Sequence, residues 1–112
     1  MCGLLLTNKT ISSEKKFYET LCLRGPDSFQ YVSHNKISFI HTLLTITGIK
    51  SPQPLISEDI YLLFNGEIYN YQEIKQYESD GYFILDSYRN EGEDFIHNLD
   101  GEFALVIVDF KK

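Results

Sequence analysis

Cys2 is the first residue whose type and position could do chemistry. Methionine aminopeptidases generally remove Met1 when the second residue is as small as cysteine. Removal would leave one residue that carries both a thiol and a free α-amine. Because an α-amine titrates near ~7.7–8.0, it is partly neutral at pH 7 and can accept the thiol proton. Cys2 is therefore a candidate nucleophile with its own base, although a small second residue is common in proteins without any catalytic role.

Asn65 and Gly66 follow an apolar run and form a second candidate site. The asparagine amide and the glycine N–H are two donors for an oxyanion, and one such donor is worth ~2.7–4 kcal/mol in a transition state. The same dipeptide is also the strongest short-range signal for a hairpin turn, so it predicts that the strand ends here. His41 could join Cys2 in a triad or be structural, and Asp80 could simply cap a helix.

Short helices and strands must position these residues. Ser12 can cap a first helix in which Phe17, Tyr18 and Leu21 share a face, and Asp80 can cap another in which Phe83, Ile84, Leu85 and Tyr88 face inward. Further helical segments are expected over 71–77 and 94–99, and strands over 2–7, 29–33, 36–41, 59–64 and 103–110, with a hairpin at His34-Asn35. This mixture predicts an α+β sandwich with helices covering a sheet.

Length and charge restrict the class of protein. A chain of 112 residues allows a single domain, residues 1–112, and the net charge of −6 argues against a nucleic-acid partner. The acids concentrate in residues 78–109, where Arg89 is the only lysine or arginine. No apolar run is long enough to span a bilayer and no signal peptide precedes the first strand. Two cysteines make no disulfide framework, so a cytoplasmic protein without membrane contact is expected.

Several motifs occur in a specific order along nearly the whole chain: Cys2-Gly3, Arg24-Gly25-Pro26-Asp27-Ser28, His41 with Leu44 and Ile46, Gln53-Pro54-Leu55, Asn65-Gly66-Glu67-Ile68-Tyr69-Asn70, Ser79-Asp80 and Leu99-Asp100-Gly101-Glu102-Phe103-Ala104. In this order they resemble the class II glutamine amidotransferases, which are N-terminal-nucleophile (Ntn) hydrolases. The similarity is greatest to the glutaminase domain of asparagine synthetase. The resemblance implies an Ntn-like αββα sandwich, here minimal or truncated.

The resemblance also implies an activity and its residues. Glutamine would be hydrolysed to glutamate and ammonia, and the ammonia would serve a synthetase partner chain in asparagine biosynthesis. Neither a metal nor an organic cofactor is implied for this half-reaction. The implied catalytic residues are Cys2, Asn65 and Gly66; the implied substrate-binding residues are Glu67, Asp80, Leu44 and Ile46; and the implied supporting residues are His41 and an ion pair of Arg24 with Asp27.

The chain departs from the family pattern where the substrate carboxylate is bound. Leu43 stands where the family has an arginine, and leucine cannot replace a bidentate arginine–carboxylate contact. Lys50 or Arg24 is a candidate replacement because both lie near the motif. Two further departures are Leu23, where a histidine is usual, and Tyr82, where an acid is usual.

Two interpretations follow from these matches and departures. In the first, the chain is a minimal amidotransferase acting on glutamine or a related small amide. In the second, it is a degenerate relative that serves as a binding, regulatory or assembly module, because Leu43, a retained Met1 and an end at Lys112 would each weaken catalysis. A chain ending at Lys112 is expected to lack part of the second sheet and the synthetase domain, and could be a fragment of a longer synthetase. Unpaired strand edges then predict a homo-oligomer or a tightly held partner.

Overall fold

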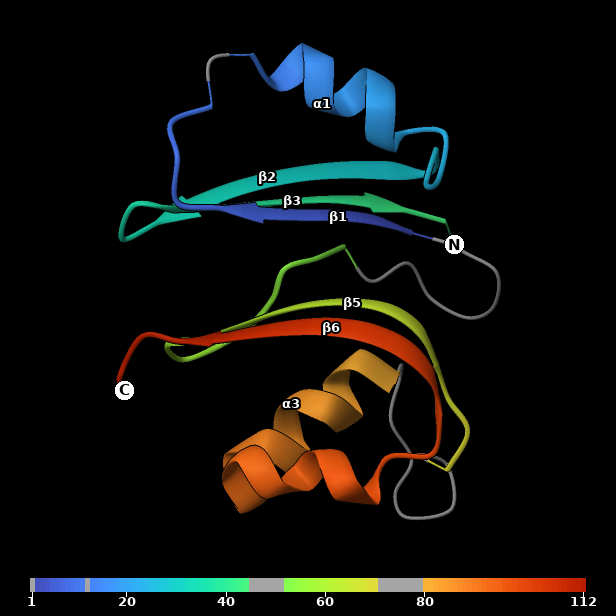
Figure 1. Cartoon of the computed structure of the whole chain (residues 1–112), viewed down its shortest axis with the longest axis vertical. Coiled ribbons are helices and arrows are strands. Elements are labelled where there is room, and N and C mark those ends of the chain that lie inside the picture. The colour runs from blue at the N-terminus through green and yellow to red at the C-terminus, as the bar shows by residue number, and fades with distance from the viewer. Residues whose placement is uncertain (1, 12, 45–51, 71–79) are drawn as a thin grey trace.

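The computed structural model describes residues 2–11, 13–44, 52–70 and 80–112 (Figure 1). The helix expected over 71–77 lies outside the described residues. The chain order of elements is β1 (Gly3–Thr7), α1 (Glu14–Leu21), β2 (Ser28–His34), β3 (Ile37–Leu43), β4 (Leu55–Ser57), β5 (Ile60–Ile68), α3 (Asp80–Glu91), the 3-10 helix η1 (Gly92–Asn98) and β6 (Gly101–Asp109).

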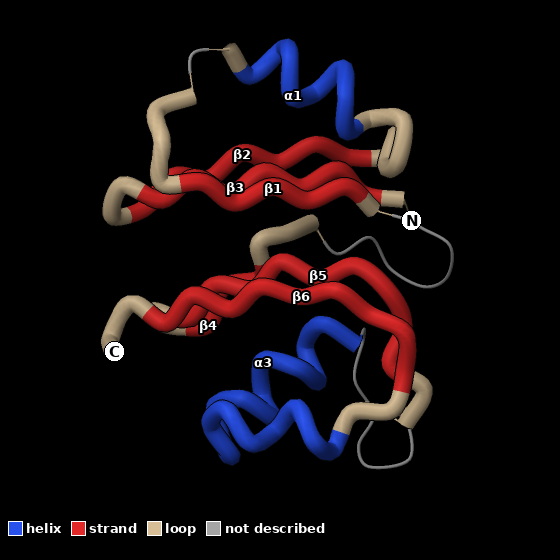
Figure 2. The backbone as a smooth tube through the Cα atoms, in the orientation of Figure 1, coloured by secondary structure: helices blue, strands red, loops and turns tan. Residues whose placement is uncertain are grey.

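The elements form four layers in the order helix, sheet, sheet, helix (Figure 2). The N-terminal sheet has the strand order β1-β3-β2 and the C-terminal sheet the order β4-β5-β6, with all neighbours antiparallel. Helix α1 covers the outer face of the N-terminal sheet, while α3 and η1 cover the outer face of the C-terminal sheet. The predicted α+β class is therefore confirmed.

Strand β5 lies between the two apolar cores and is buried on both faces. Leu62 and Phe64 pack toward α3 in one cluster, whereas Tyr61 and Leu63 pack with Phe39 of β3 in the cluster between the sheets. All five residues from Ile60 to Phe64 are buried, as the continuous apolar run predicts. The centre of the fold is thus the strand that carries Asn65 and Gly66.

Several expected elements are confirmed, with corrections at the N-terminal half. The expected hairpin joins β2 to β3, but its turn lies at Asn35-Lys36, one residue later than predicted, and Phe83, Ile84 and Leu85 of α3 face inward. The N-cap of α1 is Ser13 rather than the expected Ser12, and the helix begins at Glu14. No residue of α1 is fully buried, and Tyr18, expected on the apolar face, is exposed. In β1 only Gly3 is fully buried, since this strand lies at the edge of its sheet.

The turn expected at Asn65-Gly66 is wrong. Strand β5 continues through both residues to Ile68, with Asn65 opposite Ala104 and Gly66 opposite Phe103 in an unbroken ladder with β6. Gly66 has φ +138°, a conformation that L side chains rarely adopt. A Cβ there would also lie 2.1 Å from the Glu102 carbonyl oxygen. Glycine is required for close strand pairing and not for a reversal of the chain.

Candidate active site

Cys2 lies immediately before β1, where its backbone nitrogen meets β5 of the other sheet. The nitrogen donates to Asn65 Oδ1 at 2.9 Å, a contact between residues 63 positions apart in sequence. Because an amide oxygen accepts and its nitrogen donates, this bond orients the Asn65 Nδ2 group away from Cys2 N. The structure thus brings together two of the residues singled out in the sequence.

The rest of Cys2 is held by two segments of the N-terminal half. Leu44 N–H donates to Cys2 Sγ at 3.4 Å, and Sγ lies 3.8 Å from the Leu44 carbonyl oxygen. Arg24 Nε donates to the Cys2 carbonyl oxygen at 3.2 Å. These contacts fix the nitrogen, the sulfur and the carbonyl group of one half-buried residue. Leu44 therefore acts through its backbone, a contribution that its apolar side chain does not signal in the sequence.

The side chain of Thr42 supports this arrangement by linking β1 to the end of α1. Its Oγ1 accepts from Gly3 N at 3.2 Å and donates to the Leu21 carbonyl oxygen at 2.8 Å. The loop that carries Arg24 packs on the same strand, because a Cβ at Gly25 would lie 2.2 Å from the Thr42 carbonyl oxygen. Sequence reasoning missed Thr42, which has no special spacing or motif position.

The Gly66 N–H lies along the edge of β5 that faces away from β6. In an antiparallel strand, alternate residues bond to one side, and Phe64, Gly66 and Ile68 share this side. Phe64 N donates to Gln53 Oε1 at 2.6 Å, and Ile68 N donates to Asp80 Oδ2 at 3.1 Å. Within the described part of the chain, no residue accepts the Gly66 N–H between them. It is thus an open donor one residue from the Asn65 amide.

Gln53 is a functional-site residue whose role the sequence did not indicate, although its motif was noted. It is buried and lies two residues before β4, and its side-chain oxygen accepts the Phe64 N–H that the short strand β4 leaves unpaired. The position of Gln53 shortly before the apolar run could have indicated this role, because a buried side-chain amide beside a strand needs a backbone partner.

Asp80 is the first residue of α3 and is half-buried beside the end of β5. Burial raises the pKa of the Asp80 carboxyl above its ordinary value, the N–H of Ile68 opposes this shift, and the nearby Glu67 carboxylate adds to it. Glu67 itself is exposed. Two carboxylates near one strand end form an acidic site that would be stabilised by a cation.

His41 makes no hydrogen bond to Cys2. It lies opposite Leu4 in the ladder of β1 and β3 and is fully buried. Burial lowers the pKa of His41 from 6.5 to about 4, with the Phe64 backbone close enough to oppose the shift slightly. Neither ring nitrogen has a hydrogen-bond partner among the described residues. This neutral ring between the sheets favours the structural role over the triad.

The remaining predicted residues are placed only in part. Ile46 and Lys50 lie outside the described residues. Asp27 donates its backbone N–H to the Leu43 carbonyl oxygen at 2.8 Å, and its ion pair with Arg24 stays a prediction. The Leu43 side chain is buried, so an apolar group occupies the position of the family's arginine.

Comparisons with known proteins show the family of this chain. Residues 1–112 match the family described as the glutamine amidotransferase domain, and the chain belongs to that family. Its relatives include a probable glutamine-hydrolyzing asparagine synthetase of Dictyostelium discoideum, 34% identical over 99% of this chain and 24% of the relative. The asparagine synthetase of Sandersonia aurantiaca is 35% identical over 97% of this chain and 24% of the relative. Asparagine synthetase 2 of Bacillus subtilis (strain 168) is 33% identical over 88% and 15%.

The chain therefore resembles the glutaminase domain of asparagine synthetases and spans about a quarter or less of these relatives. No helix in the described ranges is long and apolar enough to cross a membrane.

Proposed function

We propose that this chain hydrolyses the side-chain amide of glutamine and releases ammonia, with Cys2 as an N-terminal nucleophile. The observation that carries the proposal is the hydrogen bond from Cys2 N to Asn65 Oδ1 at 2.9 Å. This bond supports the proposal because it joins the residue with the candidate nucleophile and base to the residue with a candidate oxyanion donor. The helix–sheet–sheet–helix order supports an Ntn-hydrolase fold formed by the single domain 1–112.

The reaction begins with transfer of the thiol proton of Cys2 to its own α-amine, which requires the removal of Met1. The thiolate attacks the side-chain carbonyl carbon of glutamine, and the charge on oxygen is stabilised by Asn65 Nδ2 and the Gly66 N–H. The Leu44 N–H donates to the sulfur and favours the thiolate. As the tetrahedral intermediate collapses, the α-ammonium group of Cys2 gives its proton to the leaving nitrogen, and ammonia departs. Water then hydrolyses the thioester and yields glutamate.

Charged side chains on two sides of the site are suited to bind the α-ammonium and α-carboxylate groups of the substrate. Asp80, with Glu67 beside it, would bind the α-ammonium group, and the ammonium would in turn lower the pKa that burial raises at Asp80. Arg24 would bind the α-carboxylate, because its Nε already lies 3.2 Å from the Cys2 carbonyl oxygen. This assignment explains how Leu43 can replace the family's arginine.

The ammonia acceptor is proposed from the relatives, which are named asparagine synthetases. We propose a synthetase active site, on a partner chain or on a further part of the same protein, as the consumer of ammonia. Without such an acceptor site, the released ammonia would be lost to solvent.

Intact mass before and after exposure to a diazoketone analogue of glutamine tests the proposal. We expect mass spectrometry to show loss of Met1 and one adduct, which glutamine blocks and Cys2→Ala abolishes. Cys22→Ala is the matched control, since Cys22 is a second half-buried cysteine at the end of α1 and should leave the adduct intact. Retained Met1 with no adduct would contradict the proposal.

Leu43 favours the alternative function, a binding or regulatory module without catalysis. Such a module would bind glutamine or a related amide equally well in wild type and Cys2→Ala, while both lack glutaminase activity. Calorimetric titration of the two proteins distinguishes the two functions.

A further inference from the structure

The hydroxyl group of Thr42 joins the residue that follows Cys2 to the end of α1. Thr42 is fully buried on β3, and its Oγ1 accepts from Gly3 N at 3.2 Å and donates to the Leu21 carbonyl oxygen at 2.8 Å. A Cβ at Gly3 would lie 2.5 Å from this Oγ1. Glycine at position 3 therefore leaves room for the hydroxyl group to reach the backbone beside the candidate nucleophile.

The same hydroxyl group is connected to the other side of Cys2 through Arg24. The Leu21 carbonyl oxygen, which accepts from Thr42, also accepts from Arg24 N at 3.0 Å. The Nε of Arg24 in turn donates to the Cys2 carbonyl oxygen at 3.2 Å. These contacts form a closed ring that begins and ends at the peptide unit between Cys2 and Gly3.

This ring holds the peptide unit between Cys2 and Gly3 at both of its polar groups. A trans peptide unit is planar, and its C=O and N–H groups point in opposite directions. Arg24 binds the C=O group and Thr42 binds the N–H group, so the plane is held from two sides. The orientation of this plane places the Cα atom of Cys2, from which both the α-nitrogen and the thiol project.

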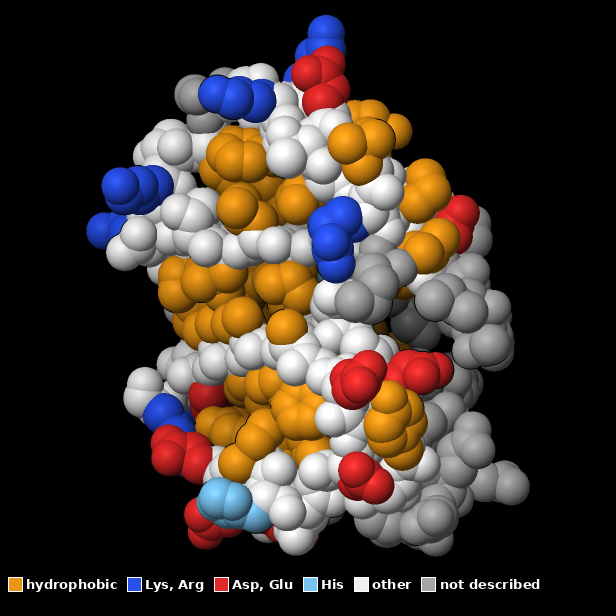
Figure 3. All heavy atoms as spheres, turned by 45° about the vertical axis from the view of Figure 1, so that its right-hand side comes forward, with side chains coloured by type: hydrophobic (Ala, Val, Ile, Leu, Met, Phe, Trp, Pro, Cys, Tyr) orange, Lys and Arg blue, Asp and Glu red, His pale blue; other side chains and the backbone are white. Residues whose placement is uncertain are grey.

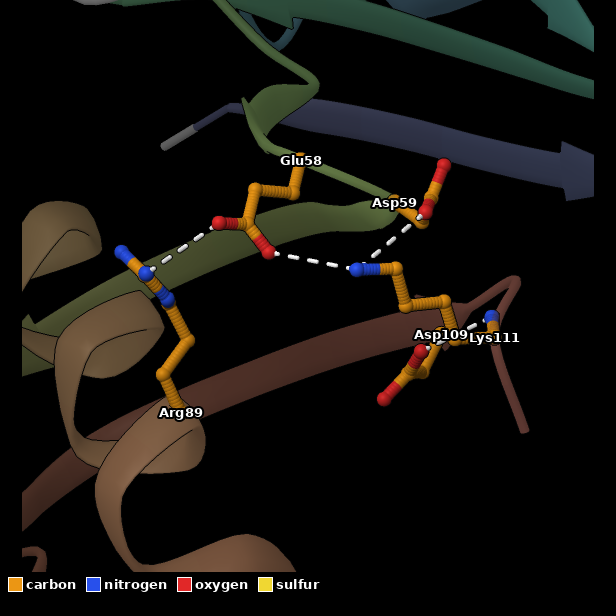
Figure 4. A network of polar contacts seen from close by, with 5 residues as sticks. All are labelled: Glu58, Asp59, Arg89, Asp109 and Lys111. Carbon is orange, nitrogen blue, oxygen red and sulfur yellow. Dashed lines mark hydrogen bonds and ion pairs between the residues drawn. The ribbon is translucent and has the colours of Figure 1, made fainter.

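The surroundings of Thr42 make its hydroxyl group difficult to replace. Apolar side chains lie in bands between the layers of the fold (Figure 3). Because Gly3 is buried as well, its N–H group would be left unsatisfied without the hydroxyl group. The ion pairs of Glu58 differ, since Arg89 Nη2 at 3.6 Å and Lys111 Nζ at 3.5 Å are exposed and water can replace them (Figure 4).

We propose that Thr42 is a positioning residue for Cys2, and that its hydroxyl group directs the thiol by orienting the peptide unit between Cys2 and Gly3. The inference rests on the proposed function of Cys2 as a nucleophile. Thr42 acts through the backbone of its neighbours and not on the substrate. Valine at this position would keep the shape of the side chain and lose the hydroxyl group, whereas serine would keep the hydroxyl group and lose a methyl group.

Thr42→Val and Thr42→Ser test the proposal in steady-state glutaminase assays. We expect Thr42→Val to lower kcat about tenfold or more, because a small displacement of a reacting group strongly reduces the rate. The KM for glutamine should change much less, since the Leu21 carbonyl oxygen keeps the N–H groups of Arg24 and Gly25, which hold the loop in place. Thr42→Ser should retain most of the wild-type kcat.

Ser38→Ala is the matched control. Ser38 is a buried residue of β3 on the same face of the sheet as Thr42, and its Oγ lies 3.3 Å from the hydroxyl oxygen of Tyr31. It lies opposite Thr7, at the end of β1 that is remote from Cys2. The control thus removes a buried hydroxyl group from the same strand, and we expect wild-type kcat and KM.

Nuclear magnetic resonance distinguishes positioning of Cys2 from a purely local structural role and does not depend on activity. We expect Thr42→Val to shift the backbone amide resonance of Leu44 and the side-chain amide resonances of Asn65, because both residues bond to Cys2 and Asn65 lies on the other sheet. These resonances should keep their wild-type positions in Thr42→Ser and in the control. In wild type, the Gly3 amide should exchange slowly with solvent, a measurement that needs no variant.

Wild-type kcat in Thr42→Val, or unmoved Leu44 and Asn65 resonances, would overturn the proposal. A Thr42→Ser variant as impaired as Thr42→Val would also overturn it, because the hydroxyl group would then not be the cause. If Thr42→Val does not fold, as judged by circular dichroism, the Gly3 amide of wild type decides, and rapid exchange would contradict the proposal. If wild type lacks glutaminase activity, the proposed function fails, and the resonance shifts alone test the positioning of Cys2.

Discussion

Both parts of the proposed site, the Cys2 nitrogen and the oxyanion donor, depend on the side chain of Asn65. Its oxygen accepts from Cys2 N, which orients its nitrogen for the proposed oxyanion. Arg24 has a comparable double role in the proposal, since its Nε donates to the Cys2 carbonyl oxygen and the residue is exposed. At this scale the substitution of Leu43 for an arginine is the departure that most needs a compensating residue.

Arg24→Ala is expected to raise the KM for glutamine about tenfold or more, with a smaller effect on kcat, because a charge-assisted contact to the carboxylate would be lost. Steady-state glutaminase assays measure both constants. Arg89→Ala serves as a control, since Arg89 is an exposed arginine of α3 whose NH2 nitrogen lies 3.6 Å from Glu58. An unchanged KM in Arg24→Ala would show that a different cation binds the carboxylate.

At the scale of elements, the end of β5 and the beginning of α3 form one unit. The short strand β4 pairs only with Ile60–Leu62, so side chains take over the backbone donors further along β5. Gln53 and Asp80 accept from Phe64 and Ile68, and the glycine N–H between them is the donor proposed for the oxyanion. The short length of β4 therefore leaves these N–H groups of β5 without a strand partner.

Asp80→Asn and Asp80→Ala are expected to separate the two contributions of Asp80. Asparagine keeps an acceptor for the Ile68 N–H, so it should preserve most of the stability while weakening glutamine binding through loss of charge. Alanine should weaken binding and also lower the free energy of unfolding by about 1–2 kcal/mol, through loss of this bond and of an acidic residue at a helix start. Chemical denaturation and KM measurements report the two effects. Equal KM values for Asp80→Asn and wild type would exclude a charge contact with the ammonium group.

The sequence predicted most elements of the fold but misread the strand at the site. Periodicity identified the apolar segment before Asn65 correctly, because burial on both faces leaves a continuous hydrophobic run. Asn-Gly favours a turn locally, yet the pairing of Gly66 with Phe103 stabilises extended backbone and overrides that preference. The contacts of Thr42, Gln53 and the Leu44 backbone could not be predicted, since they depend on how two sheets dock and not on residue type.

At the scale of the whole molecule, the two sheets meet through an apolar layer that contains the imidazole ring of His41. His41 is fully buried there, and its pKa of about 4 means that the ring is neutral in the folded protein at pH 7. In the unfolded chain the ring titrates near 6.5. The unfolded state therefore binds more protons between these values.

Stability is expected to fall as the pH falls from about 6.5 toward 4, by up to about 1.4 kcal/mol per pH unit from His41 alone. The sign follows because acid favours the state that binds more protons, which is the unfolded one. Denaturation curves at pH 7, 6 and 5 measure the loss, and His41→Asn should show a shallower pH dependence. His97→Asn is the control, because His97 is exposed on η1. Parallel pH profiles for wild type and His41→Asn would contradict the assignment.

The hydrogen bond between Cys2 and Asn65 also has a consequence for the order of events during synthesis. The N-terminus leaves the ribosome first, whereas its partner strand is made 63 residues later and is completed only when β6 pairs with it. In the proposed mechanism Met1 must be removed, and the nascent chain offers Met1 to an aminopeptidase before Asn65 has been made. We therefore expect the proposed site to be complete only after β5 and β6 have paired.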